Sequence, residues 1–237
     1  MRKRVLACLI AAVGVASAAP IGTLDIAGLD IVRISATEID FGPLGGGTGD
    51  FIVTGRTGGY LTIPPVSEGD ITDLNIATAP PGPPLAVPID PFILVPVPGA
   101  LFSFNLEQIL LGGGPSCAVA PGVGGSCTPS EIVPNSPFLL TQTATGVTVS
   151  LSLRGTVTDL MDTSSLPYDG LFTLNFTALN QDTVPELLAA FGPGGPGFVD
   201  SSWSAQLTSI PEPGTWFTMI GALLVLGSRY GSRILRK

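Results

Sequence analysis

The sequence predicts an all-β body, an antiparallel β-sandwich or jelly-roll with one short helix. Three observations lead to this expectation. Many short segments are rich in Thr, Val, Ile, Leu and Phe, and the 31 glycines and 23 prolines of the chain interrupt them frequently. Long stretches with helical periodicity are nearly absent. Many short strands joined by turn residues are typical of a sandwich, because each strand buries one face against the opposite sheet. One domain is expected over residues 19–209.

Ten short segments of this body are expected to be strands. Two of them alternate apolar and polar residues, which places every second side chain in the core. In residues 147–153 the odd positions are apolar, and in residues 171–176 the even positions are Phe172, Leu174 and Phe176. The ten segments are residues 31–34, 38–41, 51–54, 60–63, 72–77, 101–106, 138–143, 147–153, 171–176 and 202–208.

One short helix is expected after Thr183. Thr183 and Glu186 have the spacing of a capping box, and Pro185 lies in the first turn. Gly192-Pro193 ends the segment. The leucines of this helix are expected to cover one end of the sandwich.

Residues 79–99 contain eight prolines. Proline fixes φ and has no backbone N–H to give to a sheet, so the segment favours an extended, polyproline-like conformation. We expect a stiff surface loop or an edge crossing here rather than a peptide ligand for another protein.

The first eighteen residues have the three parts of a secretory signal peptide. Residues 2–4 are Arg-Lys-Arg, residues 5–15 are apolar, and Ala16 and Ala18 supply the small-residue cleavage site. The mature chain is therefore expected to begin at Ala19, after export through the Sec machinery.

Removal of the signal peptide also removes Cys8, which leaves Cys117 and Cys127. A single remaining pair in an exported chain favours a disulfide. The alternative, a metal site, needs more ligands than two thiols, and the chain has no histidine. A loop of this length predicts about 2–3 kcal/mol of stabilisation.

The C-terminal segment, residues 210–237, combines a Pro-Glu-Pro tripeptide, an apolar run and a basic end. Pro211 and Pro213 keep Glu212 in an extended, exposed stretch. A transmembrane helix is expected over about residues 215–230, with the basic end in the cytoplasm. A buried core helix is the alternative, but the run has no polar face. The anchor residues are Trp216, Phe217, Met219, Ile220, Leu223, Leu224, Val225 and Leu226, and the basic ones are Arg229, Arg233, Arg236 and Lys237.

This three-part tail resembles the PEP-CTERM sorting signal of exported proteins in Gram-negative, polysaccharide-producing bacteria. The resemblance covers residues 210–237, although the apolar run is short for the family and the basic residues are spread out. It implies that exosortase, a membrane protease, recognises Pro211, Glu212 and Pro213. It also implies transient anchoring in the inner membrane with the body in the periplasm, followed by transfer to the cell envelope or outside the cell.

Between the two signals the body has three arginines and seventeen acidic residues, a formal net charge of −14. This charge excludes nucleic acid as a natural partner, since the electrostatic interaction would be repulsive. No cofactor is expected, with calcium as the one candidate. Its possible ligands are Asp70 with Asp73, or Asp159, Asp162 and Asp169.

The absence of histidine excludes a Ser-His-Asp triad and a Cys-His pair. The sequence therefore predicts no catalytic residues, and the favoured function is a non-enzymatic surface or extracellular-matrix protein. A carbohydrate-binding or adhesive module associated with exopolysaccharide is the alternative. A secreted hydrolase that uses two carboxylates is a third, less favoured hypothesis.

Overall fold

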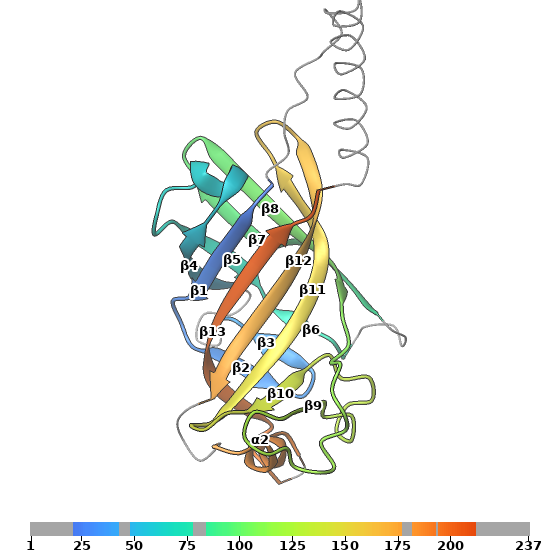
Figure 1. The fold of residues 1–237 in the computed structure, drawn as a ribbon. Coiled ribbons are helices and arrows are strands. Elements are labelled where there is room, and N and C mark those ends of the chain that lie inside the picture. The colour runs from blue at the N-terminus through green and yellow to red at the C-terminus, as the bar shows by residue number, and fades with distance from the viewer. Residues whose placement is uncertain (1–20, 43–47, 78–83, 177–181, 193, 212–237) are drawn as a thin grey trace, which may run out of the picture.

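The computed structural model describes residues 21–42, 48–77, 84–176, 182–192 and 194–211. Within them the protein is an antiparallel all-β domain with one short α-helix, as expected. The expected sandwich is wrong, because eight strands close on themselves into a single barrel (Figure 1). Alternation along a strand shows which face of the strand is buried. It does not distinguish a sandwich from a barrel, because one closed sheet buries its inner face just as two stacked sheets bury theirs.

Each barrel strand is hydrogen-bonded antiparallel to two neighbours, in the order β13-β1-β4-β5-β7-β8-β11-β12 and back to β13. This closure leaves no open edge in the ring. The bounds are β1 Thr23–Gly28, β4 Thr48–Arg56, β5 Glu68–Thr72, β7 Leu85–Val97, β8 Ala100–Ile109, β11 Val147–Asp159, β12 Ser164–Phe176 and β13 Phe198–Ser209.

Two small extensions branch from the ring. The first residues of β13 leave the barrel and pair with β2, which continues to β3 and β6. The first residues of β11 pair with β10, which continues to β9. The bounds are β2 Val32–Ser35, β3 Glu38–Asp40, β6 Leu74–Asn75, β9 Ser126–Cys127 and β10 Leu139–Gln142.

We call the end of the barrel where β1 begins and β13 finishes the upper end, as drawn in Figure 1. A 3₁₀ turn, η1 Gly58–Thr62, lies there and replaces the strand expected over residues 60–63. It buries Tyr60 with ring centroids 5.4 Å from Phe102 and 6.0 Å from Phe104. Phe104 in turn packs edge-on against Tyr168 at 5.3 Å. Aromatic rings therefore fill the upper half of the barrel.

The lower half has its own aromatic group. The rings of Phe172 and Trp203 stack with 5.7 Å between centroids, and Phe41 packs edge-on against Trp203 at 4.9 Å. Trp203 lies directly over Gly28, where a Cβ atom would clash with the indole Nε1. Glycine at this position is required because the ring occupies the space of a side chain.

The proline-rich segment is not a loop over its whole length, because Leu85–Val97 forms β7. The pairing of β7 with β8 shifts register between Ala86 and Ile89 and again between Ile89 and Ile93. Pro88 and Pro91 lie within these irregularities, where a residue without an N–H breaks no regular ladder.

The expected helix is present as α2 Val184–Phe191. The Glu186 carboxylate accepts hydrogen bonds from Thr183 N at 3.0 Å and Thr183 Oγ1 at 2.8 Å, so the capping interaction predicted from the spacing is confirmed. The helix buries Val184 and Leu187 and lies at the lower end of the barrel (Figure 1).

Candidate functional site

The described chain begins and ends at the same place. Gly22 N donates to Ser209 Oγ at 2.8 Å, and Ser209 N donates to Gly22 O at 3.0 Å. Ile210 N then donates to Pro167 O at 2.8 Å. Both ends of the body therefore leave at the upper end, and the described residues end at the first residue of the tripeptide, Pro211.

Most residues of the two predicted targeting signals lie outside the described residues. These are the signal peptide with Ala16 and Ala18, the motif residues Glu212 and Pro213, the anchor from Trp216 to Leu226, and the basic residues from Arg229 to Lys237. In the described ranges, the search for a helix of sufficient length and apolarity to cross a membrane finds none.

The predicted disulfide is present between Cys117 and Cys127. It lies in the long connection between β8 and β10, at the lower end. Cys117 N donates to Thr128 O at 3.1 Å and Thr128 N donates to Pro115 O at 2.7 Å, so two backbone bonds hold the neighbouring chain segments together. The pair joins residues ten positions apart and fixes this connection against β10.

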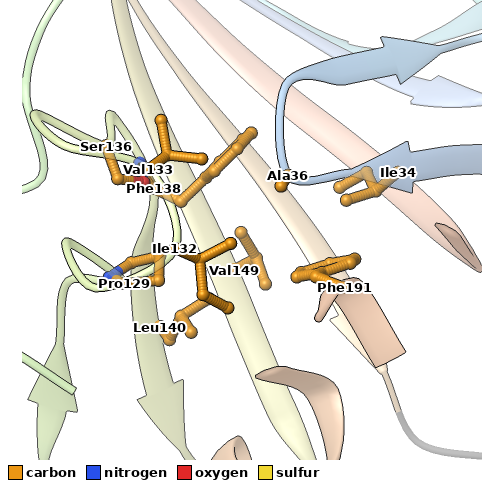
Figure 2. A pocket seen from close by; sticks show the side chains of 10 residues that line it. All are labelled: Ile34, Ala36, Pro129, Ile132, Val133, Ser136, Phe138, Leu140, Val149 and Phe191. Carbon is orange, nitrogen blue, oxygen red and sulfur yellow. Dashed lines mark hydrogen bonds between the residues drawn. The ribbon is translucent and has the colours of Figure 1, made fainter. Parts of the chain in front are cut away.

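An apolar pocket lies beside this connection (Figure 2). Its volume is about 10 Å³, roughly the minimum for one water molecule. That volume is too small for a ligand, so the pocket is a packing gap between the β8–β10 connection and α2. Its lining residues are Ile34, Ala36, Pro129, Ile132, Val133, Ser136, Phe138, Leu140, Val149 and Phe191.

A larger, charged groove lies on the outer face of the β13-β2-β3 extension. Its volume is about 220 Å³, and it is lined by Arg33, Ser35, Glu38, Asp40 and residues 196–198. Strand pairing brings these residues together, because the register places Ser35 opposite Phe198 and Arg33 opposite both Asp40 and Asp200. We call this feature the Arg33 groove.

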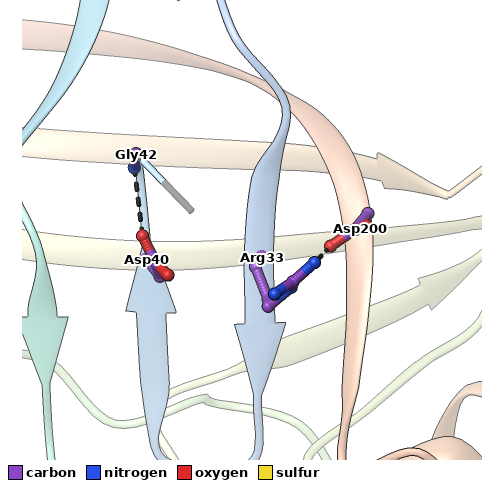
Figure 3. Close-up of polar contacts among 4 residues, drawn as sticks. All are labelled: Arg33, Asp40, Gly42 and Asp200. Carbon is purple, nitrogen blue, oxygen red and sulfur yellow. Dashed lines mark hydrogen bonds and ion pairs between the residues drawn. The ribbon is translucent and has the colours of Figure 1, made fainter. Parts of the chain in front are cut away.

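Arg33 is the electrostatic centre of the groove (Figure 3). Its Nε donates to Asp200 Oδ1 at 3.0 Å, and its guanidinium carbon lies 4.2 Å from the ring centroid of Phe198. The hydrogen bond to Asp200 raises the pKa of Arg33, and the charge of Asp40 acts in the same direction. Asp40 Oδ1 accepts a hydrogen bond from Gly42 N at 3.1 Å. The groove thus combines a fixed cation, carboxylates, a hydroxyl and an exposed aromatic ring.

The aspartates considered for calcium are not gathered into a site. Within the described ranges no group of three His, Cys, Asp or Glu side chains could hold a metal ion. Asp169 accepts from Arg154 Nε at 2.9 Å on the barrel wall. Asp159 and Asp162 accept backbone hydrogen bonds in the turn between β11 and β12.

Comparisons of the chain with protein-family models, with curated proteins and with solved structures found no match. The function must therefore be argued from the chain itself. The Arg33 groove was not predicted from the sequence, because Arg33 and Asp200 are 167 residues apart. The only local signal was the outward position of Arg33 and Ser35 in a short alternating strand.

Proposed function

We propose that this chain is an exported cell-surface or extracellular-matrix protein. Its C-terminal tail directs sorting, with recognition by exosortase at Pro211, Glu212 and Pro213. The tail anchors the chain briefly in the inner membrane with the body in the periplasm. The barrel is the delivered cargo, and it acts as a structural or interaction module without catalysis.

The position of the tripeptide carries this proposal. The last strand of the barrel ends at Ser209, and within the described residues Ile210 makes the last backbone hydrogen bond of the upper end. A protease acting beyond this point would cut no strand and no hydrogen bond of the ring. The single disulfide suits the oxidising environment outside the cytoplasm.

Sorting is tested by Glu212→Ala in the producing cells. We expect the variant to accumulate at full length in the inner membrane, while the wild-type chain reaches the surface with a shortened C-terminus. Mass spectrometry of the mature C-terminus and cell fractionation measure both. Glu68→Ala is the matched control, because it removes an exposed carboxylate from β5 and leaves the tail intact. Unchanged surface delivery of Glu212→Ala would contradict the proposal.

A second candidate function, binding of a neutral polysaccharide, is favoured by the Arg33 groove. Carboxylates can accept from sugar hydroxyls and a guanidinium can donate to them. The Phe198 ring, which is 40% exposed, adds apolar surface beside the guanidinium that lies over it. A groove of about 220 Å³ is smaller than the roughly 300–1,000 Å³ of drug-sized pockets and suits one sugar unit.

Calorimetric titration with the neutral exopolysaccharide of the producing cells, and with dextran as a second probe, tests this function. Phe198→Ala and Asp40→Asn should each weaken binding by about tenfold or more, or ~1.4 kcal/mol. Asp169→Asn is the control, because it removes a carboxylate from an ion pair outside the groove. Absence of binding by the wild-type chain, or equal loss with the control, would exclude the Arg33 groove as a polysaccharide site.

A further inference from the structure

The hairpin of β11 and β12 extends the upper end beyond the finish of β13. The last β12–β13 pair is Tyr168 with Ser209, whereas β11 and β12 continue to pair as far as Asp159 with Ser164. The tip of the hairpin, residues 160–163, therefore stands above the point where the chain leaves the barrel (Figure 1).

Two apolar side chains are exposed at this tip. Leu160 is 45% exposed and Met161 is 66% exposed. The neighbouring carboxylates are turned toward the backbone, because Asp159 Oδ1 accepts from Met161 N at 2.9 Å and Asp162 Oδ1 accepts from Ser164 N at 2.8 Å. The turn chemistry thus holds the acidic groups against the chain and presents an apolar tip.

Other exposed apolar residues lie at the same end. Ile21 precedes β1, Ile210 follows β13, and Leu61 projects from η1, with exposed fractions of 46%, 36% and 63%. η1 is joined to the start of the chain by the bond from Gly59 N to Ile21 O, 2.9 Å. Exposed apolar side chains from four segments therefore lie at the end from which the C-terminal tail leaves.

The number of residues between the barrel and the apolar run limits how far the upper end can lie from a membrane that holds the run. Six residues, 210–215, separate Ser209 from the apolar run that begins at Trp216, and they span at most about 20 Å when extended. From Pro167, which binds Ile210 N, β12 rises three residues to Ser164, about 10 Å at ~3.3 Å per residue, and the turn of residues 160–163 stands above it, so the six-residue link is long enough to span this height. The hairpin tip can therefore reach the level at which the apolar run begins.

We propose that the tip residues Leu160 and Met161 rest in the interface of a lipid bilayer while the tail is inserted. This inference rests on the proposed function of the tail. The hairpin is then a spacer that stands the barrel on the membrane and keeps the tripeptide in the gap between them. Within residues 159–164 the only charges are those of Asp159 and Asp162, so a zwitterionic surface fits better than an anionic one.

The test uses residues 19–237, the chain without the signal peptide and its Cys8, reconstituted into phosphatidylcholine vesicles that contain nitroxide-labelled lipid. A single fluorophore is attached through Met161→Cys or through the control Val123→Cys. Val123 is 73% exposed and lies in the disulfide connection at the opposite end. A second variant, Leu61→Cys, reports on η1. Flotation of the vesicles shows whether the tail is inserted.

We expect the label at residue 161 to lose roughly half its fluorescence to the lipid nitroxides, the label at 61 less, and the label at 123 almost none, because interfacial side chains sit about 5–10 Å into the boundary. Equal quenching at 161 and 123 in chains that float with the vesicles would overturn the inference and leave the tail function standing. A tip covered by a second copy of the chain would give this same result. Failure of the chain to float would overturn the tail function and this inference together.

Discussion

The ring of the barrel and its lower end are held by different kinds of contact. The ring is a continuous ladder around eight strands, filled by aromatic side chains that are buried almost completely. The lower end is a long connection and the helix α2, held by one disulfide, the short pairing of β9 with β10, a few backbone hydrogen bonds, buried apolar side chains and the side chain of Gln142. In the ring each strand is paired along both edges, whereas the lower end has only short strand pairs and a few separate contacts over a long stretch of chain.

This difference predicts two levels of cooperativity. A defect in the ring affects all eight strands, so it should lower the free energy of global unfolding. A defect at the lower end should open that end first, because local units with few shared contacts open at lower free energy than the core.

The largest effect is expected for Phe172→Ala. Phe172 is 1% exposed, and its ring centroid lies 5.9 Å from Phe41, 5.8 Å from Phe92 and 5.7 Å from Trp203. Loss of the ring leaves a cavity and should cost about 3–5 kcal/mol of unfolding free energy in urea. Leu171→Ala, on the outer face of the same strand, should cost well under half as much. Equal losses for the two would contradict a filled barrel.

The next effect is alkaline destabilisation of the ring. Burial raises the pKa of Tyr60 to about 12, and burial, with Glu107 adding to it, raises the pKa of Tyr168 further. Between pH 10 and 12 the unfolded chain loses tyrosine protons that the folded chain keeps. The stabilisation is therefore complete below pH 10 and is lost as the pH rises through 12, by about 3 kcal/mol for Tyr60 alone.

Urea midpoints measured from pH 9 to 12 test this, with tyrosinate absorbance recorded alongside. Tyr60→Phe removes one of the two groups and should reduce the slope of stability against pH. A slope that is unchanged in Tyr60→Phe would show that the phenol of Tyr60 does not drive the transition.

The disulfide tests the lower end. Replacement of both Cys117 and Cys127 by serine should cost about 2–3 kcal/mol, because a closed loop of about ten residues is released in the unfolded chain. Amide hydrogen exchange should rise first in the β8–β10 connection, while the strands of the ring stay protected. Uniform loss of protection over both regions would show that the two are a single cooperative unit.

The sequence predicted what is local in this comparison. The alternation in residues 147–153 identified the buried face of β11, and the spacing of Thr183 and Glu186 identified the start of α2. The disulfide followed from the removal of Cys8 with the signal peptide. Each of these predictions depends on residues close together in the chain or on the number of cysteines in the mature chain.

Closure of the barrel could not be predicted in the same way. It depends on the pairing of β1 with β13, which joins Asp25 to Gln206, and on β12, whose first half contains Pro167 and Gly170 and lies outside the strand predicted over residues 171–176. The Arg33 groove could not be predicted for the same reason, because its ion pair depends on the pairing of β2 with β13, which are far apart in the chain. Alternation shows which face of a strand is buried, but long-range packing determines which strands pair with it.

The smallest effect is expected for Gln142→Leu, which removes the polar link between β10 and α2. The side chain is 8% exposed; its Nε2 donates to Asp182 O at 2.7 Å and to Gly146 O at 3.1 Å, and its Oε1 accepts from Val184 N at 3.0 Å. Leucine has similar bulk but leaves these groups without a partner, which should cost about 1–3 kcal/mol.

The global cost should fall at the low end of that range, because α2 can open and let water satisfy the freed groups while the ring stays closed. Hydrogen exchange in α2 should therefore rise more than the urea midpoint falls. Gln206→Leu is the control, since its bond to Asp25 Oδ1 is exposed and its loss should change stability by less than about 0.5 kcal/mol. If Gln142→Leu instead lowers protection of the ring and α2 equally, the lower end is part of the cooperative core and the two levels of cooperativity do not exist.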